Sequence, residues 1–253
     1  MQIVIAGTGN IATVLGKKLK AAGHHIVQVF GRNPEAAILL ATELEAHSCS
    51  TWTAITQDAE LYIVAIADKA LLGGEMRLQL KDQIIVHTAG AVPMNVLKNS
   101  SSRYGVLYPF QTIRKEVAPL PEIPLMIDAN TDAVKEKLST LAKSIAKQVS
   151  FANDEERIKY HLCGVMTNNF TNYLYTLTEA YCKENGIQFS NLLPLIDETA
   201  SRLHYFSPRQ LQTGPAIRKD ESTIQLHLAM LNDDPELKKI YQLVSGEIMK
   251  YRW

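Results

Sequence analysis

A glycine-containing turn close to the N-terminus is the feature that most restricts the possible folds. The run QIVIAG at 2–7 has the apolar character of a buried strand, and IATVLGKKLKAAG at 11–23 has the spacing of an amphipathic helix. Between them the chain forms a G-x-G-x-x-A pattern, Gly7-Thr8-Gly9-Asn10-Ile11-Ala12. Glycine permits the tight turn from a strand into a helix, and a small residue lets the helix pack close to the strand. The segment therefore predicts the start of a β-α-β unit.

Strands and helices continue to alternate up to about residue 150. Near-continuous apolar runs are typical of strands that are buried on both faces of a parallel sheet. We expect further strands at 25–30, 60–67, 82–89, 104–109 and 124–129, helices at 34–46 and 131–148, and a short strand at 149–151. This order predicts a Rossmann fold, an α/β domain with a doubly wound parallel sheet.

The β pattern ends near residue 152, and only helical patterns follow. Residues 155–186 are expected to form one long helix that ends at Asn185-Gly186. Further helices are expected near 190–204, 221–231 and 235–251. We therefore predict a Rossmann domain over 1–152 and an all-α domain over 153–253.

The composition excludes several classes of function. The 253 residues include 26 Lys and Arg against 26 Asp and Glu, so no net field attracts nucleic acid or an anionic membrane. No apolar stretch approaches the roughly 20 residues that a membrane helix needs. The three cysteines lie far apart without metal-ligand spacing, so we expect reduced thiols and no metal. Because no basic leader precedes the first strand, we expect a cytoplasmic protein.

The N-terminal turn also predicts a dinucleotide site. The second glycine allows the backbone to approach a pyrophosphate, and the free N–H groups at the helix start face its phosphates. Two closely spaced glycines alone often form an ordinary turn, but their position between the first strand and its helix favours the dinucleotide. The cofactor contacts expected from this turn are Gly7, Thr8, Gly9, Asn10 and Ile11.

An arginine stands where dinucleotide sites usually have an acidic residue. Phe30 ends the second strand and is followed by Gly31, Arg32 and Asn33, while the nearest acid, Glu35, falls inside the next helix. A guanidinium binds a 2′-phosphate in a bidentate geometry, which favours NADP over NAD. Alternatively, Asn33 caps the next helix and Arg32 is a solvated charge. Since capping leaves Arg32 free, both interpretations can hold, and we expect these three residues to contact the cofactor.

Ligands of doubly wound sheets bind beyond the carboxyl ends of the strands. Two later strand ends therefore supply the remaining expected cofactor contacts, Ala67, Asp68, Thr88 and Gly90. Small residues after the second of these strands leave room for a nicotinamide ring. In the following segment, LYPFQT at 107–112, Tyr108 is equally consistent with a polar contact and with a core position.

Two groups of polar side chains in the helical half are candidates for the chemistry. His161, Asn168 and Asn172 recur at spacings of seven and four, which places them on one helix face. His161 would donate a proton while the asparagines orient a carbonyl or carboxylate, unless this face only packs against another helix. In the second group His227 shares a face with Asp220; the alternative is that Asp220 caps the helix and His227 packs beneath it. The expected catalytic residues are His161, Asn168, Asn172 and His227.

Seven segments in order resemble a known family: MQIVIAGTGNIATVLGKKL, FGRNPE, VAIAD, VHTAGAVP, LYPFQT, YHLCGVMTNNFTNYL and TGPAIRKD. The chain resembles bacterial Rossmann-like NADP oxidoreductases that carry a helical C-terminal domain of unknown function. It is similar in plan to the deazaflavin-dependent NADP oxidoreductase, ketopantoate reductase, pyrroline-5-carboxylate reductase and the β-hydroxyacid dehydrogenases. The resemblance implies a nicotinamide site at the domain interface and a homodimer packed through the helical domains. The Lys-x-x-x-Asn pair of the last group is missing, because Cys163 stands four residues after Lys159.

The sequence thus predicts an NADP-dependent oxidoreductase. It would transfer a hydride to or from a small carbonyl or imine substrate bound between the two domains. The hydride belongs to the cofactor, and the protein positions the acceptor and polarises it. The alternative is a non-catalytic NADP-binding sensor or interaction protein.

Overall fold

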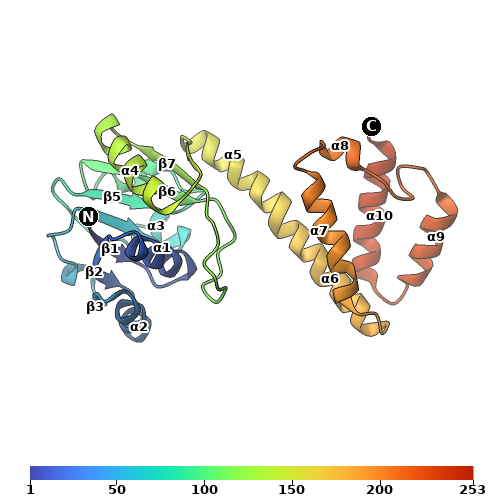
Figure 1. The fold of residues 1–253 in the computed structure, drawn as a ribbon, viewed down its shortest axis with the longest axis horizontal. Helices are drawn as coiled ribbons and strands as arrows, with labels where there is room; N and C mark the ends of the chain where they lie inside the picture. Colours follow the sequence, from blue (N-terminus) through green and yellow to red (C-terminus); the bar gives the residue numbers. More distant parts are fainter. Residues whose placement is uncertain (253) are drawn as a thin grey trace. The chain divides into compact units, whose positions relative to one another are not determined.

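Residues 1–252 are described by a computed structural model, and their strands form one eight-stranded sheet (Figure 1). In chain order these are β1 (Gln2–Ala6), β2 (His25–Phe30), β3 (His47–Cys49), β4 (Leu61–Val64), β5 (Ile84–His87), β6 (Arg103–Pro109), β7 (Leu125–Ala129) and β8 (Val149–Phe151). Their spatial order is β3-β2-β1-β4-β5-β6-β7-β8. The doubly wound Rossmann-type arrangement that the sequence predicts is confirmed.

One detail of the predicted sheet is wrong, because β7 runs antiparallel to β6 while all other neighbouring strands are parallel. Residues 110–124 connect these two strands without a helix. A parallel pair needs a crossover connection, usually helical, so a chain that turns back through a loop enters the sheet in the opposite direction. The strand β3 is an addition that the sequence pattern did not predict.

The strand order reverses beside β1. From β1 the chain builds outward through β2 and β3, and it then returns to the other side of β1 with β4 and the strands that follow. The connections after β1 and β4 therefore leave the sheet in opposite directions. The crevice beyond the carboxyl ends of these two strands is where doubly wound sheets bind ligands.

The central strands are buried on both faces. Ile3 and Ile5 pack into one apolar cluster with helices α1 (Asn10–Ala21) and α4 (Asp132–Ile145), whereas Val4 belongs to a second cluster on the opposite face. This two-sided burial is the reason for the near-continuous apolar runs in the sequence. The sheet is accompanied by α1 (Asn10–Ala21), α2 (Pro34–Leu44), α3 (Asp68–Leu72), α4 (Asp132–Ile145) and the 3-10 turns η1 (Trp52–Ala54) and η2 (Met94–Leu97).

The long helix expected at 155–186 is present, but a π-helical turn interrupts it. Its parts are α5 (Asp154–Gly164), the π turn η3 (Val165–Phe170) and α6 (Thr171–Glu184). A 3-10 turn and four helices follow: η4 (Phe189–Leu192), α7 (Leu193–Arg202), α8 (Pro208–Leu211), α9 (Glu221–Met230) and α10 (Pro235–Lys250). None of the helices within residues 1–252 combines the length and apolar character needed to cross a bilayer.

The chain divides into two compact units. Residues 1–168 form the first, which contains the sheet and α5, and the second begins at Asn169. Asn153 and Glu156 form a reciprocal capping box at the start of α5. The β structure stops with β8 at Phe151, one residue before the predicted boundary, but the first compact unit continues through α5 to Asn168.

Candidate functional site

The first glycine of the N-terminal turn is required by its backbone conformation. Gly7 has φ of 136°, and an added Cβ would collide with the Ala65 carbonyl group. Its N–H donates a hydrogen bond of 2.8 Å to the carbonyl oxygen of Phe30, which ties the turn to the end of β2. Gly31 is similarly constrained, because its Cβ would lie 2.6 Å from the Thr8 methyl group.

The second glycine faces open space. Gly9 precedes α1, and nothing lies within 4 Å of the position that a Cβ would occupy. No acidic residue stands in the first turn of α1, and no side chain caps its N-terminus. The free N–H groups of a helix start carry a partial positive charge, so this end of a twelve-residue helix suits a phosphate group. Asn10 and Ile11 are the first two residues of that helix, and their contact with the cofactor stays a prediction.

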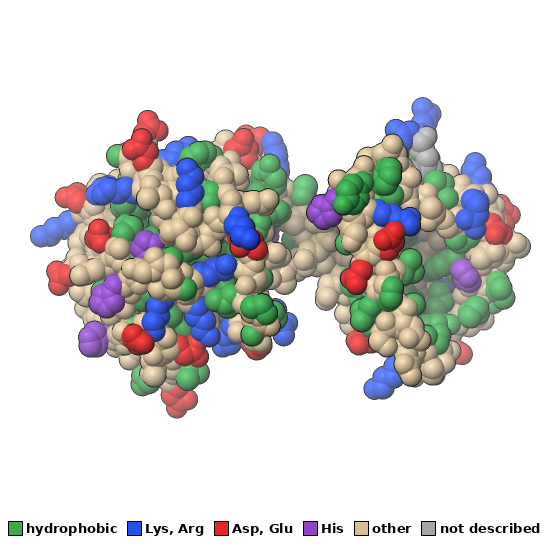
Figure 2. All heavy atoms as spheres, in the orientation of Figure 1, with side chains coloured by type: hydrophobic (Ala, Val, Ile, Leu, Met, Phe, Trp, Pro, Cys, Tyr) green, Lys and Arg blue, Asp and Glu red, His purple; other side chains and the backbone are tan. Residues whose placement is uncertain are grey.

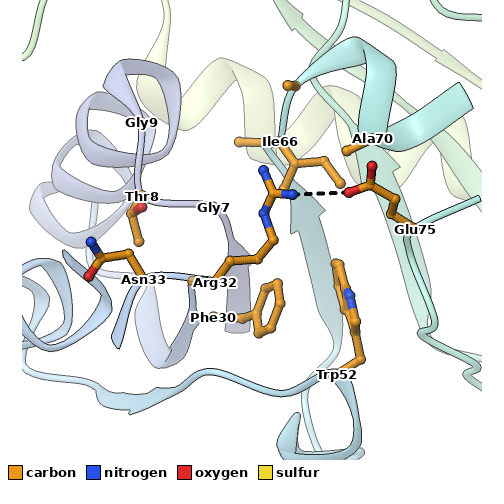
Figure 3. Close-up of a pocket in the computed structure, with 13 residues that line it drawn as sticks. Gly7, Thr8, Gly9, Phe30, Arg32, Asn33, Trp52, Ile66, Ala70 and Glu75 are labelled. Carbon is orange, nitrogen blue, oxygen red and sulfur yellow. Dashed lines mark hydrogen bonds and ion pairs between the residues drawn. The ribbon is translucent and has the colours of Figure 1, made fainter. Parts of the chain in front are cut away.

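A cavity of about 390 Å³ lies at the carboxyl ends of β1, β2 and β4 (Figure 3). The predicted cofactor residues on its walls are Gly7, Thr8, Gly9, Gly31, Arg32, Asn33 and Ala67. The walls also include residues that the sequence pattern did not single out, Phe30, Trp52, Ala65, Ile66, Ala70 and Glu75. The cavity therefore brings together the glycine turn and the arginine that follows β2.

The structure confirms the cap that was predicted for the segment after β2, and the contact of Arg32 with the cofactor stays a prediction. The side-chain oxygen of Asn33 accepts a 3.1 Å hydrogen bond from the N–H of Ala36 and so caps α2. Arg32 is 74% exposed and lies on the cavity wall, where its Nη1 donates to Oε2 of Glu75 at 3.0 Å (Figure 3). The helix cap thus does not involve the Arg32 guanidinium, which instead forms an ion pair with the Glu75 carboxylate.

An aromatic wall closes another side of the cavity. The rings of Phe30 and Trp52 have centroids 4.0 Å apart with 31° between their planes (Figure 3). Trp52 lies in the 3-10 turn after β3. The sequence pattern did not indicate β3, and it did not indicate this residue either. Such a surface suits the flat face of a base.

The other predicted cofactor residues lie elsewhere along the same sheet edge. Asp68 is exposed and begins α3 directly after Ala67. Thr88 and Gly90 follow β5, are buried, and are not part of the cavity wall. Gly90 instead packs against a side-chain pair, because its Cβ would lie 2.8 Å from Nδ1 of His161 and 2.9 Å from the Tyr108 hydroxyl oxygen.

Tyr108 on β6 and His161 on α5 form a hydrogen-bonded pair, with 3.2 Å between the hydroxyl oxygen and Nδ1. Tyr108 is both a core residue and a polar contact, since it is only 9% exposed. Burial raises the pKa of its phenol, and the positive charge of Arg157 partly offsets that rise. His161 is the more accessible member of the pair.

The other predicted catalytic residues are distributed over both units. Asn168 accepts a 2.8 Å hydrogen bond at Oδ1 from Thr112 Oγ1, in the loop after β6. Asn172 lies in the second unit on α6. His227 also lies there, with its Nδ1 2.8 Å from the Tyr241 hydroxyl oxygen. The structure therefore brings His161 and Asn168 into the first unit and places Asn172 and His227 in the second.

The capping alternative applies to Asp220. Its carboxylate accepts hydrogen bonds from the Thr223 N–H at 3.1 Å and from the hydroxyls of Ser222 and Thr223, each at 2.7 Å. These bonds lower the pKa of Asp220 to about 2. Asp220 is thus the N-cap of α9.

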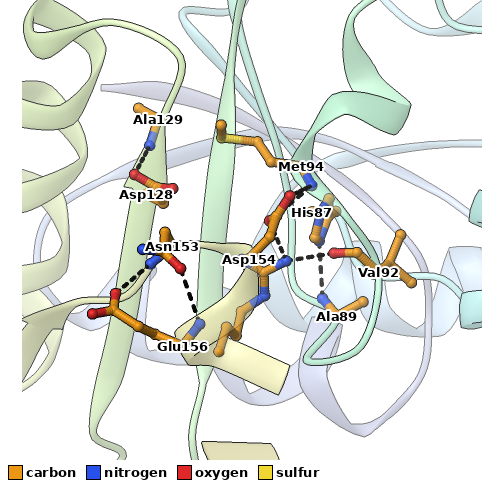
Figure 4. A network of polar contacts seen from close by, with 10 residues as sticks. His87, Ala89, Val92, Met94, Asp128, Ala129, Asn153, Asp154 and Glu156 are labelled. Atoms are coloured by element: carbon orange, nitrogen blue, oxygen red, sulfur yellow. Dashed lines mark hydrogen bonds and ion pairs between the residues drawn. The ribbon is translucent and has the colours of Figure 1, made fainter. Parts of the chain in front are cut away.

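A buried polar network that the sequence pattern did not reveal joins α5 to the end of β5 (Figure 4). Arg157 is 1% exposed, and its Nη2 donates to the Val92 carbonyl oxygen and, at 2.7 Å, to Asp154. His87 accepts a 3.2 Å hydrogen bond at Nδ1 from the N–H of Ala89. Burial, reinforced by the Arg157 charge, lowers the pKa of His87 to about 4.

Three buried atoms of this network have no hydrogen-bond partner within residues 1–252: Nε2 of His87, and Nε and Nη1 of Arg157. Unpaired buried polar groups are uncommon in proteins and cost free energy of folding, so this network at the end of β5 reduces the stability of the fold. No single sequence motif could have indicated the network, because His87 and Arg157 are 70 positions apart.

Comparison with known proteins places this geometry in a family. Residues 2–90 match the family described as NADP oxidoreductase, coenzyme F420-dependent, and residues 123–248 match a domain of unknown function, DUF2520. None of the curated proteins matches the chain.

A solved structure from Bacteroides fragilis, named as a "putative NADP oxidoreductase", is 40% identical to the chain, with a TM-score of 0.91. The match covers 99% of this chain and 98% of that one. A 1-pyrroline-5-carboxylate reductase from Streptococcus pyogenes is 17% identical, with a TM-score of 0.63 and 99% of each chain covered. An imine reductase from Myxococcus stipitatus in complex with NADP⁺ is 13% identical, with a TM-score of 0.64 over 99% of this chain and 92% of that one.

The last two likenesses show a shared fold, whereas the first extends to the sequence over nearly the whole length. Together with the family match over the glycine turn, it confirms the predicted resemblance. The chain belongs to the family of NADP oxidoreductases that join a Rossmann-like half to this helical domain, and it is an oxidoreductase that uses NADP.

Proposed function

We propose that the enzyme transfers a hydride between NADP and a small carbonyl or imine compound, with His161 as the proton donor. The observation that carries this proposal is the hydrogen-bonded pair of His161 and Tyr108 beside Gly90, at the carboxyl end of β5 and β6. Parallel strands end at the same sheet edge, so the pair lies along the edge that holds the cavity at β1 and β4.

The residues present fit NADP at its phosphate end. The open space at Gly9 and the uncapped start of α1 would hold the pyrophosphate, and Arg32 would bind the 2′-phosphate. The aromatic wall of Phe30 and Trp52 offers a surface for adenine. When bound, the nicotinamide would supply or accept the hydride.

The proton in this proposal comes from the imidazolium form of His161. In that form Nδ1–H would donate to the Tyr108 oxygen, 3.2 Å away, which would hold the ring in place and leave Nε2–H available to the oxygen or nitrogen of the acceptor. His161 would give that proton to the heteroatom of the acceptor as the acceptor carbon gains a hydride, and would itself become neutral. Asn168, anchored by Thr112, would orient the acceptor.

The test follows NADPH absorbance with a panel of small ketones, aldehydes and cyclic imines. We expect His161→Ala to lower kcat by roughly two to four orders of magnitude, as for loss of general acid catalysis, without weakening NADPH binding. His204→Ala is the matched control, because His204 is exposed in the helical unit. Tight NADPH binding without turnover of any panel member would contradict the proposed reaction, and an unaffected kcat of His161→Ala would contradict the role of His161.

We also propose that the protein is a homodimer formed through its helical unit. Large apolar side chains lie exposed on several of its helices, and green side chains gather on its visible surface (Figure 2). Phe170, Leu195, Leu226 and Leu243 are each between 59% and 67% exposed. Exposed apolar side chains gathered in this way are typical of an interface between protein chains.

Light scattering coupled to size exclusion tests the dimer directly. The expected mass is twice the 28.2 kDa of one chain, and Leu226→Glu or Leu243→Glu should shift it toward one chain because each places a charge in the interface. Lys183→Glu is the control for a charge change on an α6 position outside the apolar set. A monomeric wild-type protein would contradict the proposal.

A further inference from the structure

We propose that Glu75 competes with the 2′-phosphate of NADP for Arg32 and so limits the preference of the enzyme for NADP over NAD. The inference rests on the proposed position of the 2′-phosphate at Arg32. It concerns Glu75, which follows α3 and lies outside the glycine turn and the segment after β2.

The two side chains face each other across the cavity. Arg32 comes from the loop after β2 and Glu75 from the segment after α3, and both belong to the cavity wall (Figure 3). The 3.0 Å contact between Nη1 and Oε2 bridges these two parts of the wall. The carboxylate therefore already pairs with one guanidinium nitrogen of Arg32 on the cavity wall.

A carboxylate in this position affects two cofactors differently. NADP carries a phosphate at the 2′ position, which must share or replace the contact between Arg32 and Glu75 and which is repelled by the carboxylate. NAD has a neutral hydroxyl there, so neither the ion pair nor the repulsion opposes it. A hydroxyl can also donate a hydrogen bond to a carboxylate, as it does to the acidic residue of NAD-specific sites. Glu75 thus disfavours the phosphate without disfavouring the hydroxyl.

The size of the effect follows from the exposure of the pair. Arg32 and Glu75 are 74% and 50% exposed, and solvent screening limits exposed ion pairs to small contributions. Repulsion between the carboxylate and a phosphate adds to the cost of the broken pair. We therefore expect removal of the charge to tighten NADP binding by roughly three- to ten-fold. An orienting role, in which Glu75 holds Arg32 ready for the phosphate, would have the opposite sign.

The variant Glu75→Gln removes the charge and keeps the shape of the side chain. Calorimetric titration measures the binding of NADP⁺ and NAD⁺, and of adenosine 2′,5′-bisphosphate and adenosine 5′-monophosphate as probes with and without the 2′-phosphate. We expect Glu75→Gln to bind NADP⁺ and the bisphosphate roughly three- to ten-fold more tightly, and to bind NAD⁺ and the monophosphate within about two-fold of wild type. In an Arg32→Ala background the same substitution should have a smaller effect on the phosphate-bearing ligands.

Glu35→Gln is the matched control, because it removes an equal charge from the first turn of α2, outside the cavity wall. Weaker NADP⁺ binding by Glu75→Gln, or an equal change for NADP⁺ and NAD⁺, would overturn the inference. If wild-type protein bound neither NADP⁺ nor the bisphosphate, the proposed cofactor site itself would fail. Normal NADP⁺ binding with no response to Glu75→Gln would overturn the role of Glu75 alone.

Discussion

Acidification should destabilise the protein through His87, the buried histidine at the end of β5 (Figure 4). The folded protein holds the pKa of this side chain at about 4, against 6.5 for an ordinary histidine, first because the ring is buried and second because Arg157 is positive. Between these two values the unfolded chain binds a proton that the folded chain does not. The free energy of unfolding therefore falls as the pH decreases.

The magnitude follows from the same two pKa values. They differ by roughly 2.5 units, and each unit corresponds to about 1.4 kcal/mol, so His87 accounts for about 3 kcal/mol. This stability is fully present above about pH 6.5 and is lost progressively as the pH falls to about 4. It is a large part of the roughly 5–15 kcal/mol that stabilises a typical domain.

Urea unfolding followed by circular dichroism between pH 4 and pH 7.5 measures the effect. His87→Gln is the informative variant, because its amide oxygen can accept the hydrogen bond from Ala89 and the side chain does not titrate. Its free energy of unfolding should fall by about 3 kcal/mol less than that of wild type over this range. His25→Gln, at an exposed position, controls for loss of a histidine. Parallel pH curves for His87→Gln and wild type would refute the argument.

Two glycines give further tests with separable outcomes. Gly9→Ala should fold normally, because its Cβ meets no atom within 4 Å, and thermal unfolding checks this. We expect it to bind NADPH roughly ten-fold more weakly, about 1.4 kcal/mol by calorimetry, because the methyl group enters the space proposed for the pyrophosphate. Unchanged affinity would contradict that position of the pyrophosphate. Gly90→Ala should instead separate Tyr108 from His161, since its Cβ would lie within 3 Å of both. We expect roughly a ten-fold or greater loss of kcat with unchanged NADPH affinity, and an unaltered kcat would argue against the pair as the proton donor.

The cofactor half of the molecule could be predicted from the sequence because its determinants are local. The strand, the glycine turn and the helix are contiguous, and the backbone angle that favours glycine at position 7 belongs to this turn. The end of β2 is equally local, because Asn33 caps the helix that begins at the next residue. By contrast, β3 consists of three residues without an apolar run and leaves no comparable signal.

The partners of these residues could not be predicted, because they come from distant parts of the chain. Glu75 lies 43 positions after Arg32, and no spacing rule relates a residue after α3 to one after β2. The direction of β7 is likewise set by the loop that precedes it rather than by its own residues. The spacing argument for His161, Asn168 and Asn172 assumed a regular α-helix, whereas the π turn at Val165–Phe170 changes the angular relation between residues on its two sides.

One face of α5 contacts the loop after β5 and β6, and these contacts position the proposed proton donor His161. Asp154, Arg157 and His161 recur at spacings of three and four, so they line one side of the helix. The first two fasten the loop after β5 through the Val92 carbonyl and the Met94 N–H, and the third contacts Tyr108 above Gly90 in that same loop. Within residues 1–252 two nitrogens of the buried Arg157 have no hydrogen-bond partner, and such a group costs stability. Arg157 lies one helical turn before His161 and binds the loop after β5. That loop carries Gly90, which packs against the proposed proton donor His161, so the arginine supports the position of this histidine.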